Sequence, residues 1–199
     1  MKLFRKKYAW AAFYTLILTA FTAYVLLDAL VIPRSYAEVV QATANPEATA
    51  QADTVITEDS YSDGNMTVTI TEYRVDGTSV YVADIVLSSA DALKTAFAQS
   101  TYGKNVKEAT SEIAAEAGAV LAINGDFYGA RNSGYVIRNG VLYRSKAASA
   151  SQEDLVIYKD GSFEIVCEGD VTAEELLEAG AQQVFSFGPA LVADGEIAV

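Results

Sequence analysis

The sequence predicts an α+β domain, an antiparallel-rich sheet of hairpins with two helices, preceded by one N-terminal transmembrane helix. Three observations predict it: a long apolar run near the N-terminus, four strand-like pairs joined by Asn-Gly or Asp-Gly, and two helical segments. We expect a cytoplasmic basic tail at 1–7, a transmembrane anchor at 8–32, a flexible stalk at 33–64 and a domain at 65–199.

The apolar run from Tyr8 to Ile32 contains one charged residue, Asp28, near its far end. About 20 apolar residues cross a bilayer as a helix, whereas a cleavable signal has a shorter apolar core. The length therefore favours an uncleaved anchor over a cleaved signal. Four basic residues and no acid precede the run. They predict a single-pass protein of the cell membrane with a cytoplasmic N-terminus and an extracellular domain, and Asp28 at the membrane interface.

Residues 38–63 are rich in Ala, Thr, Gln and acids and lack hydrophobic periodicity, which predicts the stalk. From Ser35 onward, 9 basic and 25 acidic residues give a net charge of −16. This strongly acidic body argues against nucleic-acid partners and against binding of anionic lipid by a polybasic segment, because phosphate contacts need clustered Lys and Arg. The membrane partner is expected through the N-terminal helix alone.

Histidine is absent, which excludes nucleophile systems that use an imidazole base and zinc sites with His ligands. The single cysteine, Cys167, allows no intrachain disulfide, and its apolar setting favours a buried structural residue over a nucleophile. The acids show no calcium-loop spacing. We therefore expect no cofactor and no metal.

The hairpin turns are the clearest local signals. Asn-Gly and Asp-Gly suit two-residue turns, in which both central residues have positive φ. They lie at Asp76-Gly77, Asn139-Gly140, Asp160-Gly161 and Asp194-Gly195. The last hairpin ends four residues into its second strand, so we expect a sequence that is cut short, with an unpaired apolar edge.

Two segments predict helices, and a third predicts a strand. Residues 105–119 are dominated by Ala and Glu, with Gly118 placed to end a helix. Residues 172–180 begin with Thr172 as N-cap, carry acids in the first turn and stop at Gly180. The run "AVLAIN", residues 119–124, predicts a short strand buried on both faces.

The densest candidate site is "INGDFYG", which follows that strand. Asn124 and Asp126 are short polar residues at the mouth of a buried strand, where sheet proteins often carry functional groups. Phe127 and Tyr128 are suited to walling a pocket, because aromatic faces suit sugar rings. The alternative is a turn in which Asn and Asp bond their own backbone and both aromatics join the core.

The Asn139-Gly140 hairpin constrains two arginines. A two-residue turn pairs Arg138 with Val141 and Tyr135 with Arg144, so the arginines point to opposite faces unless a bulge intervenes. At most one then faces a given site, where it is a natural partner for phosphate. Ser186, in "VFSFGPALVADGEI", has no histidine to activate it, so a hydrogen-bonding or structural role is expected.

Together, "LAINGDFYG…GYVIRNGVLYR" and "VFSFGPALVADGEI" closely resemble the phosphodiester glycosidase family, whose members include a mammalian enzyme that removes N-acetylglucosamine and bacterial exopolysaccharide-related proteins. The resemblance covers roughly residues 119–199. It implies a hydrolase that cleaves between a sugar anomeric carbon and a phosphodiester. The matching residues of its motifs are Asn124, Gly125, Asp126, Phe127, Tyr128, Gly134, Arg138, Gly140, Arg144, Ser186, Gly188, Pro189 and Leu191.

The resemblance implies roles for the predicted site. Asp126 is the candidate acid/base or water-positioning group, and Asn124 a donor to sugar or phosphate. Arg144, preferred over Arg138, is the anion clamp. The family's later "DGR"-type strand and "LDGGGS"-type loop are absent from this chain. If two carboxylates are required, we expect the partner of Asp126 to be missing and the fragment to be inactive.

Three functions remain open on the sequence. The first is a membrane-anchored extracytoplasmic hydrolase of sugar-1-phosphodiesters in envelope or exopolysaccharide glycans. The second is a non-catalytic glycan-binding or envelope-structure module with the same fold. The third is a small anchored interaction domain in which "INGDFYG" is only a turn.

Overall fold

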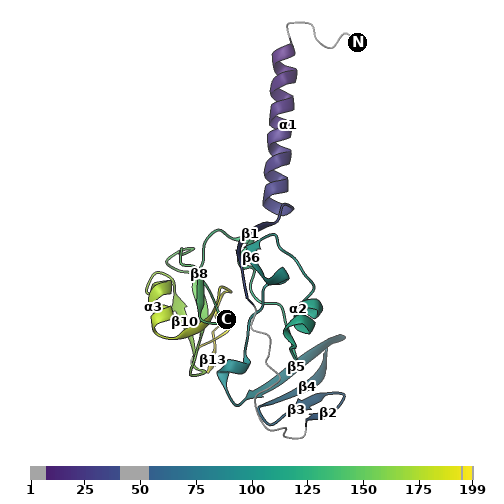
Figure 1. Ribbon diagram of the computed structural model, residues 1–199, viewed down its shortest axis with the longest axis vertical. Helices are drawn as coiled ribbons and strands as arrows, with labels where there is room; N and C mark the ends of the chain where they lie inside the picture. Colours follow the sequence, from purple (N-terminus) through teal and green to yellow (C-terminus); the bar gives the residue numbers. More distant parts are fainter. Residues whose placement is uncertain (1–7, 41–53, 194, 199) are drawn as a thin grey trace.

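The computed structural model describes residues 8–40, 54–193 and 195–198. The predicted basic tail, 1–7, and the middle of the predicted stalk, 41–53, lie outside them. Helix α1 (Ala9–Leu30) stands away from the rest of the molecule as a single rod (Figure 1), and none of its residues is buried. Its 22 residues span about 33 Å, long and apolar enough to cross a membrane.

Every strand pairing in the described residues is antiparallel. A five-stranded sheet has the order β10 (Phe163–Cys167), β9 (Glu153–Tyr158), β11 (Ala181–Phe185), β7 (Val136–Arg138) and β8 (Val141–Arg144). A four-stranded sheet contains β2 (Val55–Ile56), β3 (Ser60–Ser62), β4 (Met66–Val75) and β5 (Thr78–Leu87). Two further pairs join β1 (Arg34–Glu38) to β6 (Thr101–Lys104) and β12 (Val192–Ala193) to β13 (Glu196–Ile197).

Helices α2 (Thr110–Ala117) and α3 (Ala173–Glu178) complete the predicted α+β fold, which is confirmed. Short 3-10 turns lie at η1 (Ala90–Ala92), η2 (Ala98–Ser100) and η3 (Tyr128–Ala130). Helix α2 ends at Gly118 in the left-handed conformation. Helix α3 starts at Thr172, whose hydroxyl accepts the Glu175 N–H at 3.2 Å, while the Glu175 carboxylate accepts the Thr172 N–H.

The predicted hairpins form because their turn residues adopt the conformations they favour. Asp76 and Gly77 have φ of 49° and 78° between β4 and β5, and Asn139 and Gly140 have 51° and 73° between β7 and β8. Strands β9 and β10 also pair around Asp160-Gly161, but the predicted two-residue turn is wrong there: only Gly161 has positive φ, 87°, and the Tyr158 N–H donates to Ser162 O at 3.0 Å, which closes a longer turn. Local turn chemistry thus sets three hairpins of long or central strands.

Two expectations differ from the structure. Both ends of the predicted stalk form strands: Arg34–Glu38 pairs with β6, and Val55–Ile56 and Ser60–Ser62 join the sheet of β4 and β5. These runs are too short to show periodicity, and distant partners supply their hydrogen bonds. The predicted buried strand at 119–124 is instead irregular and exposed, with Ile123 84% exposed. Among the described residues it has no strand partner to bury it.

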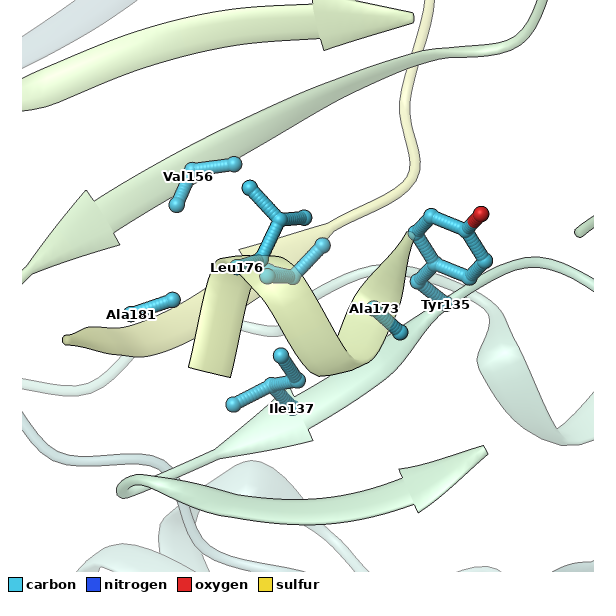
Figure 2. Packing of buried hydrophobic residues seen from close by; sticks show 7 residues of the cluster. Tyr135, Ile137, Val156, Ala173, Leu176 and Ala181 are labelled. Atoms are coloured by element: carbon cyan, nitrogen blue, oxygen red, sulfur yellow. The ribbon is translucent and has the colours of Figure 1, made fainter. Parts of the chain in front are cut away.

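The main core lies between α3 and the five-stranded sheet. Leu176 and Ala173 on α3 face Ile137 on β7 and Val156 on β9 (Figure 2), and all four are almost fully buried. Burial of each large aliphatic side chain stabilises the fold by roughly 1.5–3 kcal/mol. This packing makes β7, β9 and β11 the rigid frame on which the candidate site is built.

A second cluster, Phe97, Tyr102 and Val136 with Tyr128 and Tyr143 packed against it, lies beside this frame. Tyr102 and Tyr128 stack with ring centroids 5.4 Å apart at 18°, and Phe97 meets Tyr128 and Tyr143 edge-on. We call the four aromatic residues, Phe97, Tyr102, Tyr128 and Tyr143, the aromatic cluster. It joins β6 to η3, and so connects the strand pair below α1 to the segment that carries Asp126.

Candidate functional site

A bulge in the β7–β8 hairpin decides where the two arginines point. Val136, not Tyr135, pairs with Arg144, and Ile137 pairs with Leu142, so Tyr143 is the extra residue. The predicted pairing of Tyr135 with Arg144 is therefore wrong, although Arg138 pairs with Val141 as expected. The bulge removes the strict alternation of faces and brings both guanidinium groups to the loop 126–134.

Arg144 is engaged with that loop through the backbone. Its Nε donates to Gly134 O at 2.6 Å, and its Nη1 donates to Tyr128 O at 3.1 Å and Arg131 O at 2.7 Å. These carbonyls are the acceptors that an irregular loop must satisfy. The residue preferred as the anion clamp is thus the side chain that holds the loop in shape.

Arg138 and Asp126 form a buried ion pair, with side chains 4% and 2% exposed. Arg138 Nη2 donates to Asp126 Oδ1 at 2.5 Å, and its guanidinium lies 4.6 Å from the centre of the Phe185 ring. Its Nη1 donates to the carbonyls of Ile137 and Val184. The two residues that the sequence predicted for different roles therefore meet in one pair, fixed to β7 and β11.

Ser186 connects this pair to a second acid that the sequence reading missed. Its backbone N–H donates to Asp126 Oδ2 at 3.0 Å, and its hydroxyl donates to Asp154 Oδ1 at 2.5 Å. Ser186 is 7% exposed and Asp154, on β9, only 1%. The expected hydrogen-bonding role of Ser186 is present in the structure, since one residue holds one oxygen of each carboxyl group.

Asp154 lies beside another buried acid, Glu168, at the end of β10. Glu168 accepts the N–H groups of Tyr135 at 2.8 Å, Ala148 at 2.5 Å and Ser149 at 3.4 Å. Asp154 Oδ2 has no hydrogen-bond donor among the described residues. Burial raises the pKa of Asp154 to about 7; the negative charge of Glu168 also raises it, and the hydrogen bond from the Ser186 hydroxyl lowers it.

Gly134 lies close to Arg144, to Ser186 and to the buried acid Glu168. Its φ is +95°, and a Cβ placed there would lie 3.4 Å from Ser186 Oγ, 3.7 Å from Glu168 Oε1 and 3.8 Å from Arg144 Nη2. These distances are ordinary contacts, so a side chain is disfavoured there by the positive φ of the backbone and not by lack of space. We call Asp126, Arg138, Asp154, Glu168 and Ser186 the buried polar cluster.

The other predicted site residues lie at the surface or in the aromatic cluster. Phe127 is 77% exposed, and Asn124 is also exposed. Tyr128 packs inward, so it and Phe127 do not wall a common pocket. Phe187, next to Ser186, is 58% exposed, so each inward polar residue is followed by an outward phenyl ring. Two exposed aromatics on the loops that carry Asp126 and Ser186 can offer faces to a sugar ring.

Asp154 was detectable in principle. It shares the inward face of β9 with Val156, and an acid on the buried face of a strand is unusual. Glu168 gave no such signal, because it follows β10 in a turn. In the described residues no group of three or more Cys, Asp or Glu side chains is arranged to hold a metal ion. The chemistry available to the cluster is that of carboxyl groups, a guanidinium and a hydroxyl.

Part of the sequence also matches a known protein family. Residues 117–199 match the sequence model of the phosphodiester glycosidase family. The resemblance indicated by the motifs is confirmed over this part of the chain. The matched residues contain the entire buried polar cluster, together with Gly134 and Arg144, so the candidate site lies inside the segment that is similar to this family.

One curated relative is the SPbeta prophage-derived uncharacterized protein YomE of Bacillus subtilis (strain 168). It is 32% identical over 103 residues, which are 49% of this chain and 16% of that protein. The matched region thus spans about a sixth of this relative's length. No solved structure gave a significant match.

Proposed function

We propose that this protein is a membrane-anchored phosphodiester glycosidase that hydrolyses the bond between a sugar anomeric carbon and a phosphodiester in extracytoplasmic glycans of the cell envelope or an exopolysaccharide. The observation that carries the proposal is the buried polar cluster, which lies inside the segment that matches the phosphodiester glycosidase family. Helix α1 supplies the anchor, with the N-terminus in the cytoplasm.

Asp126 carries the chemistry in this proposal. A glycoside transition state bears positive charge at the anomeric carbon, which a fixed carboxylate stabilises while it orients a water molecule. Arg138 and the Ser186 N–H hold the Asp126 carboxylate in one orientation. Both act as positioning residues, and Asn124 donates to the sugar or the phosphate from the exposed side of the same loop.

The leaving group sets what else the site must supply. A departing phosphomonoester delocalises its own negative charge, so it needs less protonation than a sugar alcohol. Asp154 is the carboxyl group of the cluster with a raised pKa, and it accepts the Ser186 hydroxyl at 2.5 Å. It serves as a proton reservoir for Ser186, and Arg144 keeps the loop 128–134 in place.

The test is hydrolysis of a panel of methyl phosphodiesters of hexoses and N-acetylhexosamines by the full chain in detergent micelles, in ¹⁸O-labelled water. Cleavage at the anomeric carbon leaves the released phosphomonoester free of ¹⁸O, whereas attack at phosphorus labels it. Asp126→Asn should reduce kcat at least about 100-fold, and the exposed acid Asp84 offers the matched control, Asp84→Asn. Full turnover by Asp126→Asn would refute the assigned role, and binding without turnover by the parent would indicate a glycan-binding module.

A further inference from the structure

The junction between α1 and the domain is short and hydrogen-bonded. Helix α1 ends at Leu30, and β1 begins at Arg34. The Asn105 side-chain amide donates to the carbonyls of Asp28 at 3.4 Å, Ala29 at 3.3 Å and Ile32 at 3.1 Å. Carbonyls of a last helical turn lack partners within the helix, so this amide caps α1 from within the domain. Arg34 adds an ion pair with Asp28.

The chain continues from this junction directly into a closely packed strand pair. Arg34 pairs with Lys104, Ser35 with Gly103 and Ala37 with Tyr102. A Cβ at Gly103 would lie 2.2 Å from Arg34 O, so the two strands leave no room for a side chain there. In Figure 1, β1 and β6 lie immediately below α1, between the helix and the rest of the body. The first residues after the helix therefore form part of the fold.

Aromatic contacts continue from this strand pair to the candidate site. The rings of Tyr36 and Tyr102 lie 5.8 Å apart, and Tyr102 stacks on Tyr128. The Arg138 guanidinium lies 5.9 Å from the centre of the Tyr128 ring and holds Asp126. At about 3.3 Å per strand residue, Tyr36 lies about 13 Å beyond Ile32. Packed residues thus connect the site to the strand pair that follows α1.

Charge favours the same arrangement. A body with a net charge of −16 is repelled from anionic lipid and would stand away from the membrane on a loose tether. Here the junction fixes the body to α1, and the cations Arg34 and Lys104 are cross-strand partners just after the helix. A rigid, short connection places the site near lipid headgroups and limits its reach to distant polymers.

We propose that the substrate is a sugar-1-phosphodiester carried by a lipid of the same membrane, so that the lipid chain stays in the bilayer while the sugar phosphate enters the site. This inference rests on the proposed glycosidase function. Confinement to one membrane gives enzyme and substrate a high effective concentration, an advantage that depends on a geometry in which both are engaged together. A glycan polymer far from the membrane would gain nothing from it.

The test uses the full chain in phosphatidylcholine–phosphatidylglycerol vesicles and two probes with the same sugar phosphate, one a farnesyl diester in the bilayer and one a methyl diester in solution. The parent should hydrolyse the farnesyl diester at least about tenfold faster when it shares the vesicle than when it is supplied in separate vesicles. Six Gly-Ser residues inserted between Pro33 and Arg34 add a reach of about 14 Å and free the domain's orientation. Asn105→Gly removes the cap without backbone strain, since Asn105 has a φ of 57°.

Both junction variants should lose at least about fivefold in farnesyl-diester turnover and keep methyl-diester turnover within about twofold. The same insertion between Gly77 and Thr78, at the tip of the β4–β5 hairpin, should change neither. Two results would overturn this inference alone. One is a parent that hydrolyses the methyl diester but hydrolyses the farnesyl diester no faster in the shared vesicle than in separate vesicles. The other is a pair of junction variants as active as the parent on the farnesyl diester. A parent that hydrolyses neither probe would refute the proposed function and, with it, the inference.

Discussion

Asp154 predicts an unusual pH dependence of stability. The carboxyl group is 1% exposed, one oxygen has no donor among the described residues, and its pKa is raised to about 7. In the unfolded chain its pKa is about 3.9. Between about pH 4 and 7 the folded state therefore binds one proton more than the unfolded state. The free energy of unfolding must then fall as the pH rises, by up to about 1.4 kcal/mol per pH unit from this group.

Asp154→Asn isolates this contribution. An amide has the shape of a protonated carboxyl group and can donate to Glu168 at every pH, so the variant should lose the downward slope. Above pH 7 it should also be more stable than the parent. Urea unfolding of the full chain in micelles, followed from pH 4.5 to 8 by tyrosine near-UV circular dichroism, measures both; Trp10 lies in α1 and does not report on the body. An unchanged slope in Asp154→Asn, with the exposed control Asp84→Asn matching the parent, would refute the reasoning.

Three further perturbations follow from the same structure. Arg138→Leu leaves the Asp126 carboxylate buried without its cation and should cost about 3–5 kcal/mol by urea unfolding, and Asp126→Asn in that background should restore part of it; additive losses would contradict the ion pair. Gly134→Ala, at a φ of +95°, should cost about 1–3 kcal/mol in the same assay, and an unaffected variant would show that the loop adapts. Gly103→Ala should destabilise the body by about 1–3 kcal/mol and increase amide exchange in β1, unless Arg34 can move away.

Features set by neighbouring residues could be predicted from the sequence. The hairpin at Asn139-Gly140 depends on two residues that tolerate positive φ, and the start of α3 depends on Thr172 and its capping partner. The apolar content of α1 likewise needed no partner. Each of these follows from chemistry within a few residues, which is why the α+β class and the helix positions were accessible.

Features that depend on residues distant in the sequence could not be predicted from the sequence. Strand β1 exists because β6, more than 60 residues later, supplies its hydrogen bonds, and the irregular run 119–124 has no partner strand in the described residues. Of the site, Asp126, Arg138 and Ser186 were predicted, but not that they bind one another. The bulge at Tyr143 redirected Arg144. The register of β9 with β10 pairs Asp154 with Val166, two residues before Glu168, and so sets which acid lies near Asp154.

Substitution of Ser186 distinguishes a structural role of the buried polar cluster from a catalytic one. Ser186→Ala keeps the backbone N–H to Asp126 but removes the hydroxyl that lowers the pKa of Asp154. The pKa of Asp154 should therefore rise further, and the pH at which the stability slope levels off should move upward. If the Asp126 carboxylate supplies most of the catalysis, kcat should fall less than about tenfold, because the phosphate leaving group needs little proton transfer. A larger loss of kcat with no shift of that pH would instead place the Ser186 hydroxyl in the reaction and leave Asp154 as a structural acid.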